Sequence, residues 1–126
     1  MGSMFANCVV FNQSVASLDT SSVTIMNGMF LNCFVFNQSL SGFDVSNVTD
    51  MSLMFSTASA FNQDIGGWDV SSVTNFTNFM AGKTAANYSA ANLDAIYNGW
   101  SLLTLQPNLN INFGSIKYTA GGSAGR

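Results

Sequence analysis

The sequence predicts an α/β solenoid, in which each repeat forms one coil and packs only against its neighbours. Two observations predict this fold. The tripeptide Phe-Asn-Gln begins at Phe11, Phe36 and Phe61, with a spacing of 25 residues. The tripeptides lie in three units that align along their whole length, at residues 4–28, 29–53 and 54–78. The remaining segment, 79–126, contains a degenerate fourth unit and is expected to form a C-terminal cap.

Composition excludes several classes of protein. The chain has 126 residues, of which 48% are hydrophobic and only 7% are charged, with a net charge of −3. Lys83, Lys117 and Arg126 are too few to form a basic surface, so no nucleic-acid partner is expected. No apolar run is long enough to span a bilayer, and no membrane insertion is expected. Residues 1–3, Met-Gly-Ser, are typical of a cloning remnant and lack the features of a secretion signal.

The spacing of apolar residues predicts the elements of one coil. Between residues 48 and 58 they fall at intervals of three and four, which predicts a short helical segment. The stretches FNQSL (36–40) and FNQDI (61–65) suit short strands that end in a turn. A strand and a helix within 25 residues is the leucine-rich-repeat layout. We therefore expect a right-handed coil with short parallel strands on one face and short helical segments on the other.

The segment after residue 84 predicts the cap. Leu93, Ile96 and Trp100 lie at helical spacing behind Ser89, a good N-cap residue, so a helix should cover the last coil. The alternating stretch NLNINFG (108–114) fits one more strand. We therefore expect a helical and extended C-terminal cap.

Two polar residues recur in every unit and are expected to form structural ladders. They are Asn12, Asn37, Asn62 and Asn87, and Asp19, Asp44, Asp69 and Asp94. A repeated Asn usually satisfies backbone groups of a turn, and an Asp before Ser or Thr commonly forms an Asx turn. Stacked carboxylates also leave calcium open at Asp19, Asp44 and Asp69, although no loop gathers three acidic residues as calcium motifs do. No metal or other cofactor is expected.

Cys8 and Cys33 share one repeat position, which Ala58 fills in the third unit. Side chains in register point in parallel, whereas a disulfide needs Cβ atoms within ~4.5 Å, so free packed thiols are expected. The chain contains no His and no Glu, and therefore offers no zinc site and no evident base to activate a nucleophile. No enzyme activity and no catalytic residue are expected.

The iterated pattern "MF..(C/A)..FNQ(S/D)(L/I)..(W/F)DVS(S/N)VT(D/N)M" covers residues 4 to about 80. It resembles the BspA-like leucine-rich-repeat surface proteins of bacteria. The resemblance implies cell-surface or extracellular display, adhesion to a protein or glycan on another cell surface, and no catalysis. Leu18 and Phe76 depart from the pattern. The chain is thus expected to be an interaction module from a larger repeat protein.

Two alternative functions remain open. The chain could be a purely structural spacer, or its repeated threonines, Thr24, Thr49 and Thr74, could form a regular column that binds ice or mineral.

Two surfaces are candidates for binding. The glutamine after each repeated Asn, together with the variable next residue, forms a candidate recognition strip: Gln13, Gln38, Gln63, Ser14, Ser39 and Asp64. The first coil has no polar cap, so its end is expected to expose the apolar residues Met4, Phe5, Phe11, Val15 and Leu18. Because an exposed apolar patch marks an association surface, we expect a homodimer formed through the N-terminal coil.

Overall fold

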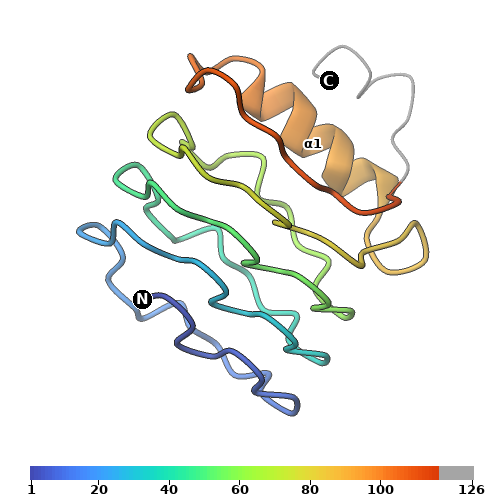
Figure 1. Cartoon of the computed structure of the whole chain (residues 1–126). Helices are drawn as coiled ribbons and strands as arrows, with labels where there is room; N and C mark the ends of the chain where they lie inside the picture. The colour runs from blue at the N-terminus through green and yellow to red at the C-terminus, as the bar shows by residue number, and fades with distance from the viewer. Residues whose placement is uncertain (117–126) are drawn as a thin grey trace.

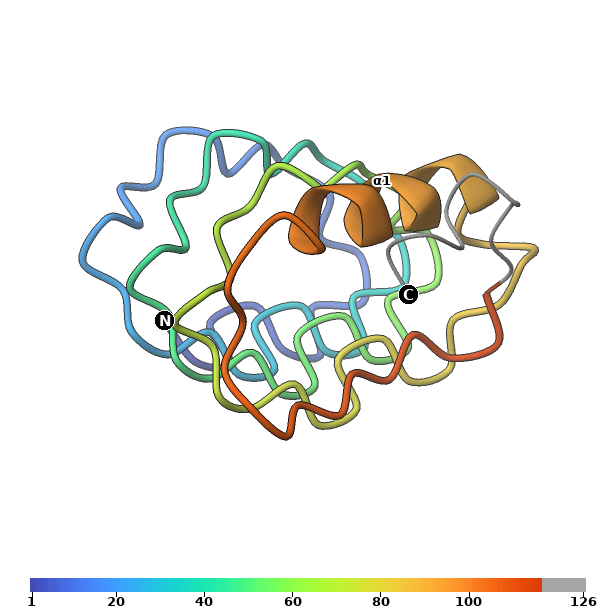
Figure 2. The ribbon, with the colours of Figure 1, turned by 90° about the horizontal axis from the view of Figure 1, so that it is seen from above.

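In a computed structural model, which describes residues 1–116, the chain winds into a stack of coils that runs from the N-terminus at one end to a helix at the other (Figure 1). Parallel bridges join Ile25 to Asp50 and Asp50 to Asn75, so equivalent residues of successive repeats lie side by side. Viewed from above, the coils surround a common interior, and the helix lies over the end of the stack (Figure 2). The 25-residue period of the sequence is therefore the period of the coils.

The elements within a coil differ from those expected. Among residues 1–116, helix α1 (Ala90–Trp100) is the sole α-helix, and strand pairing is limited to isolated parallel bridges. The stretch 48–58, expected to be helical, is instead a run of tight turns. Its N–H groups alternate between two partners: Met54 N–H bonds back to Met51 O at 3.3 Å, and Leu53 N–H bonds to Thr77 O of the next coil at 2.9 Å. The assignment to the leucine-rich-repeat class stays a prediction.

Left-handed backbone at two positions of each coil explains why no helix forms there. Leu53 and Thr57 have φ of 60° and 56°, and the equivalent Gly28 and Asn32 have φ of 59° and 58°. A residue in this region cannot continue a right-handed helix. The spacing of three and four in the sequence therefore reflects consecutive three-residue turns, which also return side chains to the interior.

The FNQ stretches also differ from expectation, because side chains rather than paired strands join the coils there. Asn37 N–H donates to Asn12 Oδ1, and Asn62 N–H donates to Asn37 Oδ1, both at 2.9 Å. The backbone ladder lies elsewhere, where alternate N–H groups of 26–32 donate to carbonyls of 50–56 at 2.7–3.1 Å. Each coil is thus joined to the next by backbone bonds on one side and by amide side chains on another.

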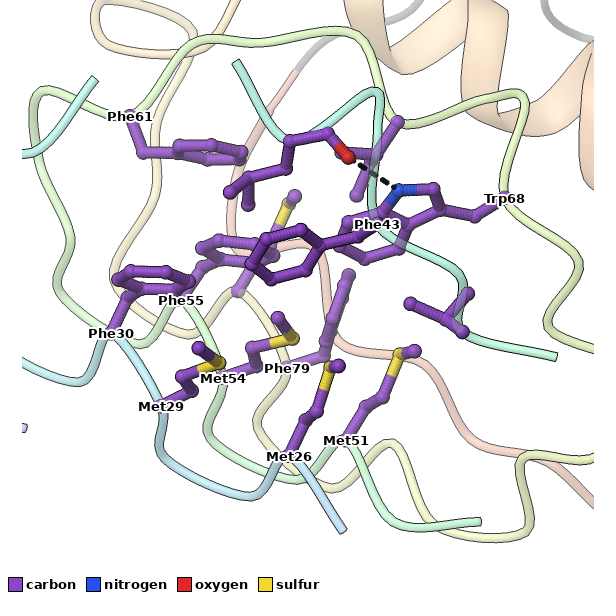
Figure 3. Packing of buried hydrophobic residues seen from close by; sticks show 14 of the residues in the cluster. Met26, Met29, Phe30, Phe43, Met51, Met54, Phe55, Phe61, Trp68 and Phe79 are labelled. Atoms are coloured by element: carbon purple, nitrogen blue, oxygen red, sulfur yellow. Dashed lines mark hydrogen bonds between the residues drawn. The ribbon is translucent and has the colours of Figure 1, made fainter. Parts of the chain in front are cut away.

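Stacked aromatic rings and methionines fill the interior (Figure 3). The ring centroids of Phe30 and Phe55 lie 5.8 Å apart, and within one coil those of Phe55 and Phe61 lie 4.1 Å apart. Met26 and Met51 pack below the rings. Each ring therefore packs both against a ring of its own coil and against the equivalent ring of the next coil, which stabilises the stack unit by unit.

The helix predicted behind Ser89 is confirmed. Ser89 Oγ accepts the Asn92 N–H at 3.1 Å as the N-cap of α1, and Leu93, Ile96 and Trp100 are buried. Trp100 Nε1 donates to Ile65 O at 3.2 Å, as Trp68 Nε1 donates to Leu40 O one coil earlier. The helix therefore takes the place of a further coil and closes the core.

The two ends of the described chain join the ladder. Met80 N–H donates to Asn112 O at 2.8 Å, and Thr84 bridges Ser115 in parallel, so the strand expected over 108–114 is reduced to this short pairing. At the other end, the Met1 ammonium donates to Ile25 O at 3.1 Å, and Ser3 N–H donates to Asn27 O at 2.7 Å. Residues 1–3 thus pair with residues 25–27, and their interpretation as a cloning remnant stays a prediction. Lys117 and Arg126 lie outside the described residues.

Candidate functional site

The repeated Asn-Gln pairs hold successive coils together. Asn12 Oδ1 accepts the Asn37 N–H at 2.9 Å and the Gln38 Nε2 at 3.0 Å. Asn37 Oδ1 accepts the Asn62 N–H and the Gln63 Nε2, both at 2.9 Å. Each Gln Nε2 also donates to the backbone oxygen of the same Asn at 3.2 Å. The tripeptide therefore has a structural role, because it satisfies backbone and side-chain groups of two coils at once.

The fourth step of this ladder does not use Asn87, which corrects the sequence interpretation. Asn62 Oδ1 accepts the Ser89 N–H and the Asn92 Nδ2, both at 2.9 Å. Asn87 instead caps a local turn, where its Oδ1 accepts the Thr84 N–H at 2.8 Å. The register shifts because Tyr88, not residue 86, stacks on Phe61 with a centroid distance of 6.3 Å. The aromatic residue before Ser89 was the signal that could have revealed the shift.

The repeated aspartates are used by their own turns. In each of Asp19, Asp44 and Asp69, Oδ1 accepts two hydrogen bonds from the serine that follows two residues later. The serine N–H donates at 3.0 Å, and the serine hydroxyl donates at 2.6–2.7 Å. The hydrogen bond from the serine hydroxyl, followed by that from its N–H, lowers the pKa of each carboxyl group. Asp94 lies in α1 and does not continue this column. Among residues 1–116 no three acidic, His or Cys side chains gather as metal ligands would, including at the aspartates left open for calcium.

The amide ladder leaves polar groups directed outward. Because Asn37 Oδ1 receives two donors, its amide is fixed, and its Nδ2 has no acceptor among the described residues. Gln63 uses Nε2 for two acceptors of Asn37, and its Oε1 has no donor in the same part of the chain. The outward donors and acceptors form two neighbouring columns, here called the amide columns: Nδ2 of Asn12, Asn37 and Asn62, and the amide oxygens of Gln38, Gln63 and Asn92.

A hollow of about 310 Å³ adjoins the amide columns. Its lining consists of Ser39, Ser41, Gln63, Asp64, Ile65, Gly67 and Trp68. Three residues of the predicted recognition strip, Ser39, Gln63 and Asp64, are therefore brought together. The other three, Gln13, Ser14 and Gln38, are not part of the lining. The hollow combines hydroxyl, amide and carboxylate groups with apolar surface from Ile65 and Trp68.

Local turns fix the polar groups of the hollow. Asp64 Oδ1 accepts the Gly66 N–H at 2.8 Å, and its other oxygen has no donor among residues 1–116. Ser39 Oγ accepts the Ser41 N–H at 3.3 Å and donates to Ser41 Oγ at 3.0 Å. This arrangement leaves the Ser41 hydroxyl hydrogen available as a donor in the same hollow as the Asp64 carboxylate.

The apolar surface of the first coil differs from the predicted one. Val15 is only 3% exposed and Phe5, Phe11 and Leu18 are partly buried, so of the predicted patch Met4 alone is well exposed, at 50%. Val15 is buried because its side chain points into the coil, as Leu40 and Ile65 do in later coils. Further exposed apolar residues, which the sequence interpretation missed, lie beside the FNQ stretches of the first two coils: Val9, Val10, Phe34 and Val35.

The repeat position that Cys8 and Cys33 share is occupied by a lysine in the fourth unit. Both cysteines are free, and Cys33 Sγ–H donates to Phe5 O at 2.9 Å, while burial raises the pKa of its thiol. Lys83, at the fourth equivalent position, is 1% exposed, and its ammonium donates to the carbonyls of Ala58 at 2.7 Å, of Phe61, and of Asn87 at 3.4 Å. Burial lowers the pKa of Lys83 to about 8. A lysine at a repeat position that otherwise holds small, apolar residues was the signal that sequence analysis missed.

Comparison with known proteins identifies the family. A family described as "Mycoplasma protein of unknown function, DUF285" matches residues 1–94. No curated protein and no solved structure gives a significant match. None of the helices formed by residues 1–116 is long and apolar enough to cross a membrane. Because the family match covers more than half of the chain and all three regular repeats, the chain belongs to the DUF285 family.

Proposed function

We propose that the chain is a non-enzymatic interaction module, displayed on a cell surface as part of a larger repeat protein, and that it binds a protein or glycan partner. The observation that carries the proposal is the pair of amide columns beside the hollow lined by Gln63 and Asp64. Their groups are fixed by inward hydrogen bonds and keep outward hydrogen-bonding capacity. Preorganised polar groups lose little entropy when a partner binds, which favours recognition.

The sequence pattern supports the surface location. Within the DUF285 family, the 25-residue pattern resembles the BspA-like branch of surface proteins. We include that finer assignment, with its adhesive role, in the proposal.

The positions of the perturbed ionisable groups support a non-enzymatic role. Lys83, Tyr88 and Cys33 have shifted pKa values because they are buried among coils. None of these three residues lines the hollow. A catalytic group needs access to its substrate, so these shifts fit a packing role better than a chemical one.

Binding to intact cells tests the proposal. Beads coated with the folded chain are incubated with fixed host cells, and binding is measured by flow cytometry against beads coated with the unfolded, alkylated chain. We expect saturable binding that requires the folded chain. Loss after protease treatment of the cells indicates a protein partner, and loss after periodate treatment indicates a glycan. The absence of saturable binding on every cell type tested would reject the interaction module and leave a structural spacer.

A second candidate rests on the exposed threonines. Thr49 N–H and Oγ1 donate to Thr24 O at 2.8 and 3.2 Å, and Thr74 repeats both bonds to Thr49 O. This regular column favours the ladder type of ice or mineral binding. Thermal hysteresis of the freezing point, compared between the wild-type chain and Thr49→Lys, tests it. Hysteresis that Thr49→Lys abolishes supports ice binding, and its absence in the wild type rejects it.

A further inference from the structure

We propose that Asn37, Ser41, Gln63 and Asp64 form a binding site for a neutral glycan, whose hydroxyl groups pair with the amide columns. This inference rests on the proposed function and narrows its partner to one chemical class. It follows from which hydrogen-bonding groups the ladder uses and which it leaves outward.

The first step is the pairing of a donor with an acceptor. Gln63 Nε2 donates to Asn37 Oδ1, but no return bond joins Asn37 Nδ2 to Gln63 Oε1. One donor and one acceptor therefore remain on adjoining amides. A sugar hydroxyl both donates and accepts, so sugar hydroxyl groups have the chemistry to satisfy both atoms.

The hollow supplies a second donor and acceptor. The Ser41 hydroxyl retains its hydrogen for an outside acceptor, and one oxygen of Asp64 retains its lone pairs for an outside donor. Together with the amide pair, these groups offer two donors and two acceptors, which is the chemistry that sugar hydroxyl groups require. The hollow's volume of about 310 Å³ admits a sugar ring.

Charge selects a neutral ligand. Asp64 contributes a negative charge at the hollow, and the Lys83 ammonium is buried with its hydrogens donated to backbone carbonyls. The whole chain carries a net charge of −3. A sulfated or carboxylated glycan would therefore meet repulsion, whereas a neutral one would not.

Repetition extends the site along the stack. The amide columns recur once per coil, at a spacing expected to be ~4.8 Å. A polymer with hydroxyl groups along its length therefore gains a further contact at each coil. Each contact is weak, because the indole of Trp68 is buried and leaves little ring face for stacking on a sugar. The affinity for the polymer therefore depends on contacts with several coils at once.

Nuclear magnetic resonance with defined oligosaccharides tests the site. The ¹⁵N-labelled chain is titrated with mannohexaose, with cellohexaose and with an alginate hexamer as the anionic probe. We expect at least one neutral probe to shift the side-chain amide signals of Asn37 and Asn62 and the backbone signals of Gly66 and Gly67. Alginate should leave these signals unchanged.

Isosteric variants give the matched control. Asn37→Asp keeps an oxygen for the Asn62 N–H and the Gln63 Nε2 but loses the outward donor, and should weaken binding about fivefold. The control variant Asn75→Asp makes the same charge change at a position whose equivalent in the preceding coil is already an aspartate, Asp50. It keeps the acceptor for the Thr77 N–H, so it should bind the glycan as the wild type does. Should Asn37→Asp alter the fold, Ser41→Ala removes the hydroxyl donor at an exposed position instead, with the same expected loss.

The outcomes separate this site from the proposed function. No shift at Asn37 and Asn62 with either neutral probe, or equal weakening by Asn37→Asp and Asn75→Asp, overturns the glycan site. If the chain still binds cells and only protease abolishes that binding, the interaction module stands with a protein partner. If cell binding is also absent, both proposals fail. Self-pairing of the amide columns in place of glycan binding would appear as shifts at Asn37 that depend on protein concentration alone, and would also overturn the site.

Discussion

The Nε2 group of Gln63 donates to Oδ1 of Asn37, one coil earlier, at 2.9 Å. This bond ties neighbouring coils together and also orients the outward groups of both amides. A single pair of residues therefore links the stability of the stack to the surface proposed for binding.

Replacing Thr57 with Asn should stabilise the chain. Thr57 has φ of 56°, which is unfavourable for a β-branched residue, whereas Asn7 and Asn32 occupy the equivalent positions of earlier coils. An Asn would relieve the strain, and its Nδ2 could replace the Thr57 hydroxyl as donor to Asn32 Oδ1, just as Asn32 Nδ2 donates to Asn7 Oδ1 at 2.7 Å. We expect the free energy of unfolding in urea to rise by about 1 kcal/mol. Asn32→Thr should lower it, and equal stabilities of all three proteins would contradict the assignment of strain.

Replacing Gly66 with Ala should displace helix α1. A Cβ at Gly66 would lie 2.3 Å from Ala95 O, whereas a Cβ at the adjacent Gly67 would meet no atom within 4 Å. We expect Gly66→Ala to lower the free energy of unfolding by about 1–3 kcal/mol and Gly67→Ala to leave it nearly unchanged. Urea denaturation followed by tryptophan fluorescence measures both. Equal effects of the two substitutions would show that α1 does not pack as described.

Stability should increase with pH because of Lys83. Burial lowers the pKa of Lys83 from 10.5 to about 8, so in this range the unfolded chain binds more protons than the folded one. We expect the free energy of unfolding to rise by about 1 kcal/mol between about pH 7.5 and 9. Burial raises the pKa of Cys33 and Tyr88, which opposes the trend at higher pH. Lys83→Met removes the rise, and a wild-type chain whose stability is constant over this range would refute the effect of burial.

The homodimer expected through the N-terminal coil stays a prediction, and substitution of an exposed apolar residue of that coil tests it. Val10 is 85% exposed in the first coil, and Leu102, also 85% exposed, follows α1 at the other end. We expect light scattering to give twice the monomer mass for the wild type and for Leu102→Asp. Val10→Asp should be monomeric, since a charge there disrupts an apolar contact. A wild type that is monomeric at every concentration would exclude this dimer.

The parts of the fold that could be predicted depend on regular spacing. The 25-residue repeat aligns the phenylalanine columns, and the helical spacing behind Ser89 predicts α1, because both signals are carried by side chains that face the core. The turns of 48–58 could not be predicted in the same way. Leu53 and Thr57 seldom adopt positive φ, and the left-handed backbone is indicated instead by the Gly and Asn residues at equivalent positions of the other units: Asn7, Gly28, Asn32, Asn78 and Gly82.

The candidate site could be predicted only in part. Gln63 and Asp64 were selected because they follow the repeated Asn, and both line the hollow. Ser41 and Trp68 come from separate coils, and their approach to the hollow depends on the stacking of those coils. The shift of the ladder from Asn87 to Ser89 was hidden because the fourth unit departs from the 25-residue period.

The most direct test of the amide ladder compares Gln63→Ala with Gln13→Ala. Gln63 donates to two oxygens of Asn37, whereas Gln13, at the equivalent position of the first coil, has no hydrogen-bond partner among residues 1–116. Urea denaturation should show that Gln63→Ala lowers the free energy of unfolding by about 1–2 kcal/mol and that Gln13→Ala changes it by less than about 0.5 kcal/mol. Equal effects of the two substitutions would contradict the role of the Phe-Asn-Gln repeat in joining the coils.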